Sequence, residues 1–384
     1  MKISILLPYK ENFSPTYAGA VSLFVKDTTL RSKYKKVITV FGHTEYKKIF
    51  NVNYVNIPFG KKIFQSGSKS YVSKFLNIEE QNPSNIIEIH NRPNYLEYLP
   101  KTLKAKIVLY FHNDPLTMIS SKTKNQRINI FKKSYKIIFN SEWSKKRFLN
   151  GLNKVYYKSE KLIVIYQSTN KVKINLNKKK NWIIFVGKLN RAKGYDLFGK
   201  AVLKILNKFP NWKAIAIGDE PREKLIFIHK NLKKLGFLKH ERVLDIFTKT
   251  SIAVACSRWN EPLGRTGLEA SSRGCAVIIS NRGGLPETIT NGIIIKRLNE
   301  LNVYNSIKKL IENSKYRRTL QKLSIKNFMH THKNIVNKID LYRNIAIDYG
   351  LFKINFYKKK EKLKILHVTN FNERHDGRLF FNTG

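Results

Sequence analysis

Short apolar runs alternate with amphipathic stretches along the first half of the chain. Runs rich in Ile, Leu, Val and Phe are typical of strands that are buried on both faces of a parallel sheet. The strand candidates are residues 2–7, 36–41, 86–89, 107–111, 136–139 and 162–166. Because helical patterns lie between several of these runs, the alternation predicts an α/β domain with a doubly wound parallel sheet.

The second half of the chain repeats this alternation. Its strand candidates are residues 182–186, 213–217, 252–255, 276–279 and 292–295. Residues 171–180, between the halves, are polar and almost free of pattern, as expected of a linker between domains. The sequence therefore predicts two Rossmann-like domains, an N-terminal one over residues 1–170 and a C-terminal one over residues 181–334.

Glycines and polar residues directly follow strands of the second half. Gly187 and Gly218 each come after an apolar run, and the polar segment 257–261 follows a third. In sheets of this kind, ligands bind beyond the carboxyl ends of the strands. We therefore expect a binding site along that rim of the second domain.

Two glutamates, Glu261 and Glu269, stand in a glycine-containing segment with seven residues between them. Gly264 lets the backbone approach a ligand closely, and a short helix is expected to begin near Arg265. The unpaired amides at such a helix start suit a phosphate group. Glu269, about one turn inside the helix, can accept hydrogen bonds from sugar hydroxyls. The alternative is a capped surface helix with two solvated acids.

A second segment suited to phosphate lies upstream, where Gly187 ends an apolar run. Lys188 and Lys193 flank the turn that follows, and a helix is expected to start near Tyr195. Two ammonium groups on one loop can neutralise a diphosphate. Because lysine is common throughout this chain, the loop alone is weak evidence. It becomes significant because the two-glutamate segment follows it in the sequence.

In these two segments the chain resembles the retaining glycosyltransferases of family 4, or glycosyl transferases group 1, which have the GT-B fold. The family pattern Gly-Arg-Leu, then Lys-Gly, is matched by residues 187–194, its two glutamates by Glu261 and Glu269, and a further segment by residues 280–287. Two positions depart from the pattern. Lys188 replaces an arginine and lacks its bidentate fork, and Leu263 replaces a phenylalanine.

The resemblance implies two parallel sheets facing a central cleft and transfer of a sugar from a nucleotide-diphosphate sugar, with retention at the anomeric carbon. Lys188 and Lys193 would stabilise the charge left on the diphosphate, helped by the amides near Gly264 and Arg265. The nucleotide sugar is a co-substrate, and no cofactor is expected. The chain contains no Asp-x-Asp triplet, which disfavours a metal-dependent GT-A enzyme and suggests that no metal is needed.

The resemblance also implies roles for single side chains. Glu269 would hold the ribose of the nucleotide, and Glu261 would orient the sugar in a catalytic role. In the first domain, Gly19 matches a glycine loop that approaches the donor phosphate. His112 matches a histidine near the transferred sugar, although a lone histidine at a strand end is commonly a satisfied structural group.

Further expectations concern the acceptor and the chain end. His90 and Arg92 follow another strand and are candidates to face the acceptor, whereas Asp114 is a candidate helix cap. Family members of this kind often build lipopolysaccharide or other envelope glycans, so a glycan or lipid-linked acceptor is expected. By the same analogy, a last helix over residues 335–357 would cross back to the first domain.

The formal net charge of +47 is extreme and unevenly distributed. Between Asp114 and Glu142 the sequence has no acidic residue. Ile128, Phe131 and Tyr135 share one face at helical spacing, so this stretch is either a basic amphipathic helix on an anionic membrane surface or a solvated face over a packed stripe. No recognised nucleic-acid-binding motif accompanies the charge, so no specific nucleic acid is expected as a partner.

The two cysteines and the absence of a long apolar stretch indicate the compartment. Cys256 and Cys275 lie in apolar or helical surroundings and are expected to fill the core as free thiols, which points to a reducing cytoplasm. No stretch reaches the roughly 20 apolar residues needed to span a bilayer, and the N-terminus has no signal peptide. We expect a cytoplasmic protein, with the inner face of the membrane as a peripheral location.

Residues 358–384 contain an apolar run and a glycine-containing loop that echo the first strand of the chain. We interpret this tail as the start of a further GT-B domain; the alternative is an edge strand. Two functional alternatives to the transferase also stay open. One is another GT-B enzyme, an epimerase or a phosphorylase, and the other is a non-catalytic basic protein that binds anionic lipid or nucleic acid.

Overall fold

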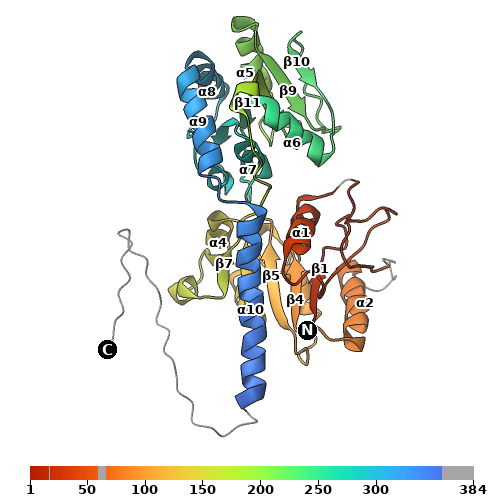
Figure 1. Cartoon of the computed structure of the whole chain (residues 1–384). Coiled ribbons are helices and arrows are strands. Elements are labelled where there is room, and N and C mark those ends of the chain that lie inside the picture. The colour runs from red at the N-terminus through yellow and green to blue at the C-terminus, as the bar shows by residue number, and fades with distance from the viewer. Residues whose placement is uncertain (17, 59–65, 357–384) are drawn as a thin grey trace.

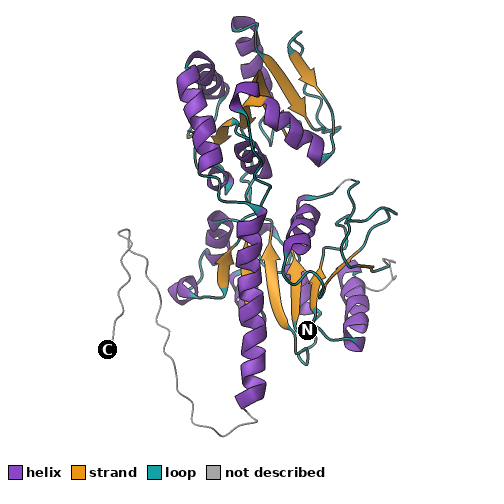
Figure 2. Ribbon diagram, viewed as in Figure 1, coloured by secondary structure: helices purple, strands orange, loops and turns teal. Residues whose placement is uncertain are grey.

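The computed structural model describes residues 1–16, 18–58 and 66–356, with side chains up to residue 347. Two α/β domains lie one above the other, and each is a parallel sheet between layers of helices (Figures 1 and 2). Apolar clusters cover both faces of each sheet. The predicted pair of Rossmann-like domains is confirmed. The tail expected to begin a further domain, residues 358–384, lies outside the described residues.

The sheet of the first domain has seven parallel strands in the order β3-β2-β1-β4-β5-β6-β7. The pattern of apolar runs predicts all of these strands but β3, a short edge strand that is only partly buried. The bounds are β1 (Ile3–Leu6), β2 (Ile38–Gly42), β3 (Tyr54–Asn56), β4 (Ile86–His90), β5 (Lys106–Phe111), β6 (Lys136–Phe139) and β7 (Leu162–Val164).

The sheet of the second domain has six parallel strands in the order β10-β9-β8-β11-β12-β13. Again the edge strand, β10, is the one that the apolar pattern does not predict, because it reads Leu-Lys-Lys and is largely solvated. The bounds are β8 (Lys180–Val186), β9 (Lys213–Ile217), β10 (Leu232–Lys234), β11 (Thr250–Ala255), β12 (Ala276–Ser280) and β13 (Ile293–Ile295).

Helices connect the parallel strands, as parallel pairing requires. Two of them begin where the sequence predicts, at Tyr195 and at Arg265. The bounds are α1 (Ala20–Arg31), α2 (Gly67–Gln81), α3 (Lys124–Lys133), α4 (Glu142–Leu149), α5 (Tyr195–Lys208), α6 (His240–Lys249), α7 (Arg265–Ser272), α8 (Glu300–Glu312), α9 (Ser314–Lys326) and α10 (His332–Phe356). The described helices include none that is long and apolar enough to cross a membrane.

Helix α10 starts at the junction of the domains and runs along the first domain (Figure 1). Ile335, Ile339 and Tyr342 are buried in the apolar cluster that β1 and α1 also line. Arg343 reaches the sheet and forms a bidentate pair with Glu88 of β4, at 2.7 and 2.8 Å. The last helix is thus part of the first domain's packing.

The basic stretch between Asp114 and Glu142 packs onto the first domain through its apolar side. Ile128 and Phe131 of α3 pack against the core, whereas Tyr135 lies beyond the end of the helix, which Ser134 terminates. The interpretation of Ile128, Phe131 and Tyr135 as one lipid-facing helical stripe is therefore wrong. The packed stripe with a solvated basic face is the arrangement that the structure has.

Both cysteines are buried free thiols, as predicted. Burial raises the pKa of Cys256 to about 12 and raises that of Cys275 as well. Neither is a reactive thiolate at neutral pH, because desolvation disfavours the charged form.

Candidate active site

The loop after β8 brings Lys193 to Glu261. The Lys193 Nζ lies 2.5 Å from the Glu261 Oε1, and the glutamate side chain is 12% exposed. The side chain of Asn190 fixes this loop, because its Oδ1 accepts a hydrogen bond from the backbone N–H of Lys193 at 2.9 Å. The two segments singled out in the sequence thus meet through an ion pair.

Close backbone contacts hold the rim around this pair. Gly218, at the end of β9, has a φ of +126°, and a Cβ there would lie 1.9 Å from the carbonyl oxygen of Gly187. Gly283 has a φ of +62°, and a Cβ there would lie 2.1 Å from the carbonyl oxygen of Glu261. The same oxygen accepts a hydrogen bond from the N–H of Gly284 at 2.7 Å. Only glycine fits such positions without strain.

Glu269 lies in α7 and is a buried acceptor. Its Oε1 accepts hydrogen bonds from the Arg265 Nε at 2.9 Å and from the His240 Nε2 at 2.8 Å. Burial alone would raise the pKa of this carboxyl, but Arg265 and His240 outweigh it and lower the pKa to about 2. Glu269 is therefore ionised at neutral pH and able to accept hydrogen bonds from hydroxyl groups.

Arg265 carries buried donors that are not satisfied. Among the described residues, neither its Nη1 nor its Nη2 has a hydrogen-bond partner. The Nη2 lies 2.9 Å from the Glu269 Oε1, but not in hydrogen-bond direction. Because unpaired buried guanidinium donors cost free energy, the arrangement favours an anion beside them.

The predicted residues of the second domain form one contiguous group. A Cβ built on Gly264 would lie 3.7 Å from the Cβ and Cγ of Glu261, so the Lys193–Glu261 pair borders the start of α7 and its Arg265–Glu269 pair. Lys188 is exposed on the same loop as Lys193. Among the residues that the structure describes, the side chain of Lys188 has no hydrogen-bond partner, and its role stays a prediction.

In the first domain, Gly19 stands at the start of α1. A Cβ there would lie 2.3 Å from the Glu11 Oε1, which accepts hydrogen bonds from the N–H and the Oγ of Ser22, both at 3.0 Å. The carboxylate of Glu11 thus accepts a hydrogen bond from a backbone amide in the first turn of α1. The structure gives Gly19 a packing role, and its contact with a donor phosphate stays a prediction.

His112 follows β5 and is buried against His90 of β4. The His90 Nδ1 lies 3.0 Å from the His112 Nε2. Burial lowers the pKa of His90 to about 3, with a further contribution from Arg343, and the pKa of His112 also falls well below its ordinary value. Both imidazoles are therefore neutral near pH 7. His90 is buried behind His112. Contact with an acceptor would require His90 at an exposed surface, and the structure does not place it there.

Sequence reasoning missed Asn91. Its φ is +54°, and its Oδ1 accepts hydrogen bonds from the backbone N–H groups of His112 and Asn113, both at 3.1 Å. Asparagine tolerates this left-handed conformation better than most residues. An Asn between a predicted strand and the Arg92-Pro93 pair is therefore the sequence signal for a turn at this position. Arg92 is half-buried, and its Nη1 donates to the carbonyl of Asn91 at 2.9 Å.

Asp114 caps the turn that follows His112, as predicted. Its Oδ1 accepts a hydrogen bond from the N–H of Leu116 at 3.0 Å, and its carboxylate is paired with Arg147 of α4. Asp114 therefore fixes the loop that carries His112.

Segment 280–287 joins the two domains. Glu287, in the turn η5 (Leu285–Thr288), accepts hydrogen bonds from the N–H groups of Glu142 and Trp143 at 2.7 and 2.8 Å and from the hydroxyl of Tyr166 at 3.0 Å. In addition, Ser141 donates to the carbonyl of Pro262 at 2.5 Å. These bonds hold the start of α4 in the first domain against the glutamate segment of the second.

The comparison with known families fits this geometry. Residues 167–326 match the model of the family "Glycosyl transferases group 1". The second domain is thus similar in sequence to the group 1 glycosyltransferase domain. Spore coat protein SA of Bacillus subtilis is 24% identical over 361 residues, which cover 84% of this chain and 93% of that protein. The lipopolysaccharide core biosynthesis mannosyltransferase LpsB of Rhizobium meliloti is 29% identical over 116 residues, or 28% of this chain and 33% of that protein.

Solved structures confirm the GT-B fold for both domains together. The crystal structure of Anabaena Alr3699/HepE in complex with UDP and glucose superposes with a TM-score of 0.69 at 17% sequence identity. The match covers 90% of this chain and 99% of that one. The domain that matches the group 1 model is therefore one half of a two-domain GT-B fold.

Proposed function

We propose that the protein is a retaining, metal-independent glycosyltransferase of family 4 that moves a sugar from a nucleotide-diphosphate sugar to a glycan or lipid-linked acceptor. The observation that carries the proposal is the contiguous group of Lys193–Glu261 and Arg265–Glu269 beyond the carboxyl ends of the second sheet. The two cations of this group can bind a diphosphate, and its two carboxylates can accept hydrogen bonds from sugar hydroxyls beside it.

In the proposed reaction the bond between the anomeric carbon and the diphosphate oxygen breaks, and its electron pair stays on the diphosphate. Lys188, Lys193 and the unpaired donors of Arg265 stabilise that charge. An acceptor hydroxyl attacks the anomeric carbon from the same face, and its proton passes to the leaving phosphate oxygen. Glu261 orients the sugar and Glu269 holds the ribose, while His112 positions the transferred sugar from the first domain.

Relatives support the donor and the pathway. HepE was crystallised with UDP and glucose, which favours a nucleoside diphosphate in the site of this chain. LpsB is named as a lipopolysaccharide core mannosyltransferase, which favours an envelope glycan as the product. We therefore propose a role in envelope polysaccharide or lipopolysaccharide synthesis in the cytoplasm.

The test is a thermal-shift screen over nucleotide sugars, followed by an assay for release of free nucleotide with and without a glycan acceptor. A ligand that binds only the native state raises the melting temperature. We expect a stabilising nucleotide sugar, acceptor-dependent nucleotide release and an unchanged anomeric configuration in the product. Stabilisation without any nucleotide release would instead favour an epimerase, and the absence of any binding would favour a non-catalytic basic protein.

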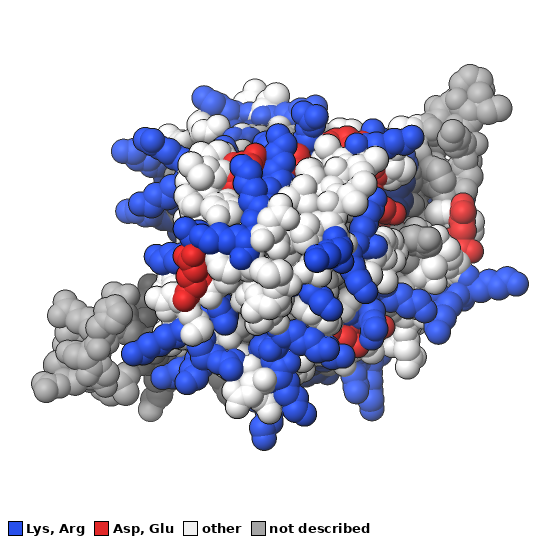
Figure 3. Space-filling model, turned by 90° about the horizontal axis from the view of Figure 1, so that it is seen from above, with Lys and Arg blue, Asp and Glu red and all other residues white. Residues whose placement is uncertain are grey.

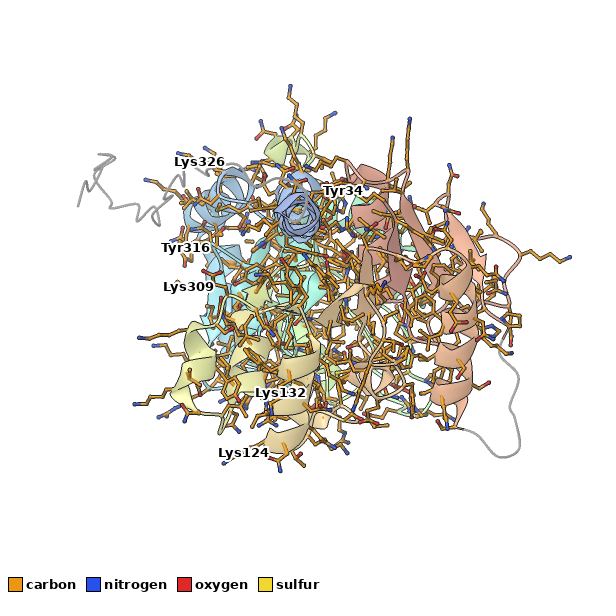
Figure 4. The ribbon with its side chains drawn as sticks, turned by 90° about the horizontal axis from the view of Figure 1, so that it is seen from below. Tyr34, Lys124, Lys132, Lys309, Tyr316 and Lys326 are labelled. Atoms are coloured by element: carbon orange, nitrogen blue, oxygen red, sulfur yellow. The ribbon has the colours of Figure 1, made fainter. Side chains whose placement is uncertain are left out.

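An anionic membrane surface is the partner that we propose for the exposed face of α3 and the neighbouring turn η3 (Lys154–Lys158). Phe131 and Tyr156 pack edge to face at 4.9 Å and join the two elements. Val155 of η3 is 71% exposed, and Ile119, five residues before α3 in the chain, is 70% exposed. Figure 4 shows Lys124 and Lys132 along α3 at one margin of the first domain. Such a mixture of charge and apolar tips suits anionic lipid.

The basic character extends beyond this face. Figure 3 shows Lys and Arg side chains across the face of the molecule seen from above, with few acids among them. A specific orientation on a membrane would therefore depend on the exposed apolar residues near α3, because the charge alone is widespread.

A further inference from the structure

His90 and His112 form a buried pair in which each ring has one nitrogen without a partner. Among the described residues, the His90 Nε2 and the His112 Nδ1 have no hydrogen-bond partner, while the other two nitrogens lie 3.0 Å apart. The exposed fractions of the two residues are 1% and 7%. Unpaired buried polar atoms are rare, and two in one pair call for a physical reason.

Aromatic rings fix the orientation of the pair. His90 stacks on Tyr110 with centroids 4.2 Å apart and planes at 12°. Phe24 contacts His112 edge to face at 5.3 Å. Asn91 holds the backbone N–H of His112, and the contacts with His90 and Phe24 hold its ring. Arg265 of the second domain is among the charges that lower the pKa of His112, after burial and His90.

We propose that His90 is a positioning residue for the transfer reaction, because it sets the tautomer of His112 and so decides whether the Nδ1 of His112 donates or accepts a hydrogen bond. This inference rests on the proposed function, in which His112 positions the transferred sugar. His90 itself does not touch the substrate. It acts through the hydrogen bond that joins the two rings.

Because both rings are neutral imidazoles joined by one hydrogen bond, the tautomer of one ring fixes the tautomer of the other. One nitrogen of each ring carries a hydrogen and the other accepts. If the shared hydrogen sits on the His90 Nδ1, His112 must carry its own hydrogen on Nδ1 and offers a donor. If it sits on the His112 Nε2, the Nδ1 of His112 is an acceptor and His90 carries its hydrogen on Nε2. Both rings therefore carry hydrogen on the same-named nitrogen.

Three substitutions of His90 separate this role from simple packing. His90→Asn places an amide where the Nδ1 stands, so it keeps the hydrogen bond to His112. His90→Gln moves the amide towards the unpartnered Nε2, and His90→Phe keeps only the ring. The asparagine variant should behave like the native protein, and the other two should not, although phenylalanine preserves more of the stacking on Tyr110.

The first measurement needs no ligand. Nitrogen-15 correlation spectra of the histidine rings at neutral pH should show His90 and His112 as one and the same tautomer. His112 should stay in that tautomer in His90→Asn and become a mixture in His90→Phe and His90→Gln. Opposite tautomers in the native protein, or an unchanged His112 signal in His90→Phe, would overturn the proposal whatever the enzyme's activity is.

The second measurement uses UDP and UDP-glucose as probes. We expect all three variants to bind UDP as the native protein does, within about two-fold, since His112 does not contact the nucleotide in the proposed site. The turnover of UDP-glucose should fall about ten-fold in His90→Phe and His90→Gln, the effect of one lost hydrogen bond, and recover in His90→Asn. If the native protein binds neither probe, the fault lies with the proposed donor, and the ring spectra still decide the coupling. Equal turnover in all variants would overturn the positioning role.

Discussion

Glu287 of the second domain accepts a hydrogen bond of 2.8 Å from the backbone N–H of Trp143, in the first turn of α4 in the first domain. A carboxylate at a helix start satisfies unpaired amides and complements the helix dipole. In this protein Ser141 of the first domain caps the N–H of Ser144, and the other domain supplies the acceptor for the N–H groups of Glu142 and Trp143. Capping of α4 is therefore coupled to the relative placement of the two domains.

Replacing Glu287 with Ala should loosen that placement. We expect a loss of about 1 kcal/mol in the free energy of unfolding, the usual cost of a lost cap, together with a larger radius of gyration in small-angle scattering. The KM for the donor should rise, because residues of both domains face it in the proposed site. Glu142→Ala, in the same turn of α4, is the matched control; if it expands the molecule equally, the coupling through Glu287 is refuted.

Lys193 tests the proposed diphosphate contact. Lys193→Ala should lower kcat/KM by roughly 100-fold or more, since removing one preorganised donor at a developing charge has about this effect. Stability should change by only about 1 kcal/mol, because the Lys193 side chain is 32% exposed and solvent screens its pair with Glu261. Kinetics and melting curves of Lys193→Ala and of the exposed Lys200→Ala check this. A larger effect on melting than on turnover would mark Lys193 as structural.

Glu269 should make stability depend on pH in the acid range. Its pKa is about 2 in the folded protein against an ordinary value of 4.5, so its contribution is complete above about pH 5 and is lost as the pH falls towards 2. The shift corresponds to about 3 kcal/mol. We expect Glu269→Gln to unfold more easily than the native protein at neutral pH and to lose this difference only as the pH falls to about 2, as measured by urea unfolding.

The same substitution tests the donor site. Glu269→Gln and Glu269→Ala should abolish nucleotide binding, and the alanine variant should also be less stable, because Arg265 and His240 lose their common acceptor. Glu241→Gln, an exposed acid on the neighbouring α6, serves as the control. Unaltered nucleotide affinity in Glu269→Gln would refute the assigned role.

The sequence predicted the central strands because their burial on both faces leaves an unbroken apolar run, as in β12. The edge strands β3 and β10 escaped prediction since half-solvated strands lack that pattern. In the site, the position of both segments after strand ends predicted that they share one rim of the second sheet, whereas the direct pairing of Lys193 with Glu261 was not predicted. The pairing of His90 with His112 and the cap that Glu287 supplies could not be predicted, because they depend on strand order and on domain placement, which local patterns do not encode.

The basic face of α3 should bind anionic vesicles. Exchanging Lys124 and Lys132 for Ala should weaken binding to phosphatidylglycerol vesicles about 30-fold, from about 1 kcal/mol for each charge near the surface. Lys309→Ala with Lys326→Ala removes the same charge from the second domain, at another margin in Figure 4, and is the matched control. Equal weakening in both double variants would show a general effect of net charge, and salt-insensitive binding would end the electrostatic explanation.

Arg343 anchors α10 to the first sheet, and its removal should be the most destabilising change considered. Both partners of the Arg343–Glu88 pair are 1% exposed, so Arg343→Ala leaves a buried carboxylate without its cation. We expect a loss of about 3–5 kcal/mol in the free energy of unfolding. The double variant Glu88→Leu with Arg343→Met should lose less, since it removes the Glu88 carboxylate together with its cation and keeps the volume filled, although Asp340 loses its pair with Arg343 in both variants. Chemical unfolding of the native protein and both variants measures the difference. If the double variant is less stable than Arg343→Ala, the stabilisation lies in packing of the arginine and not in its charge pairing.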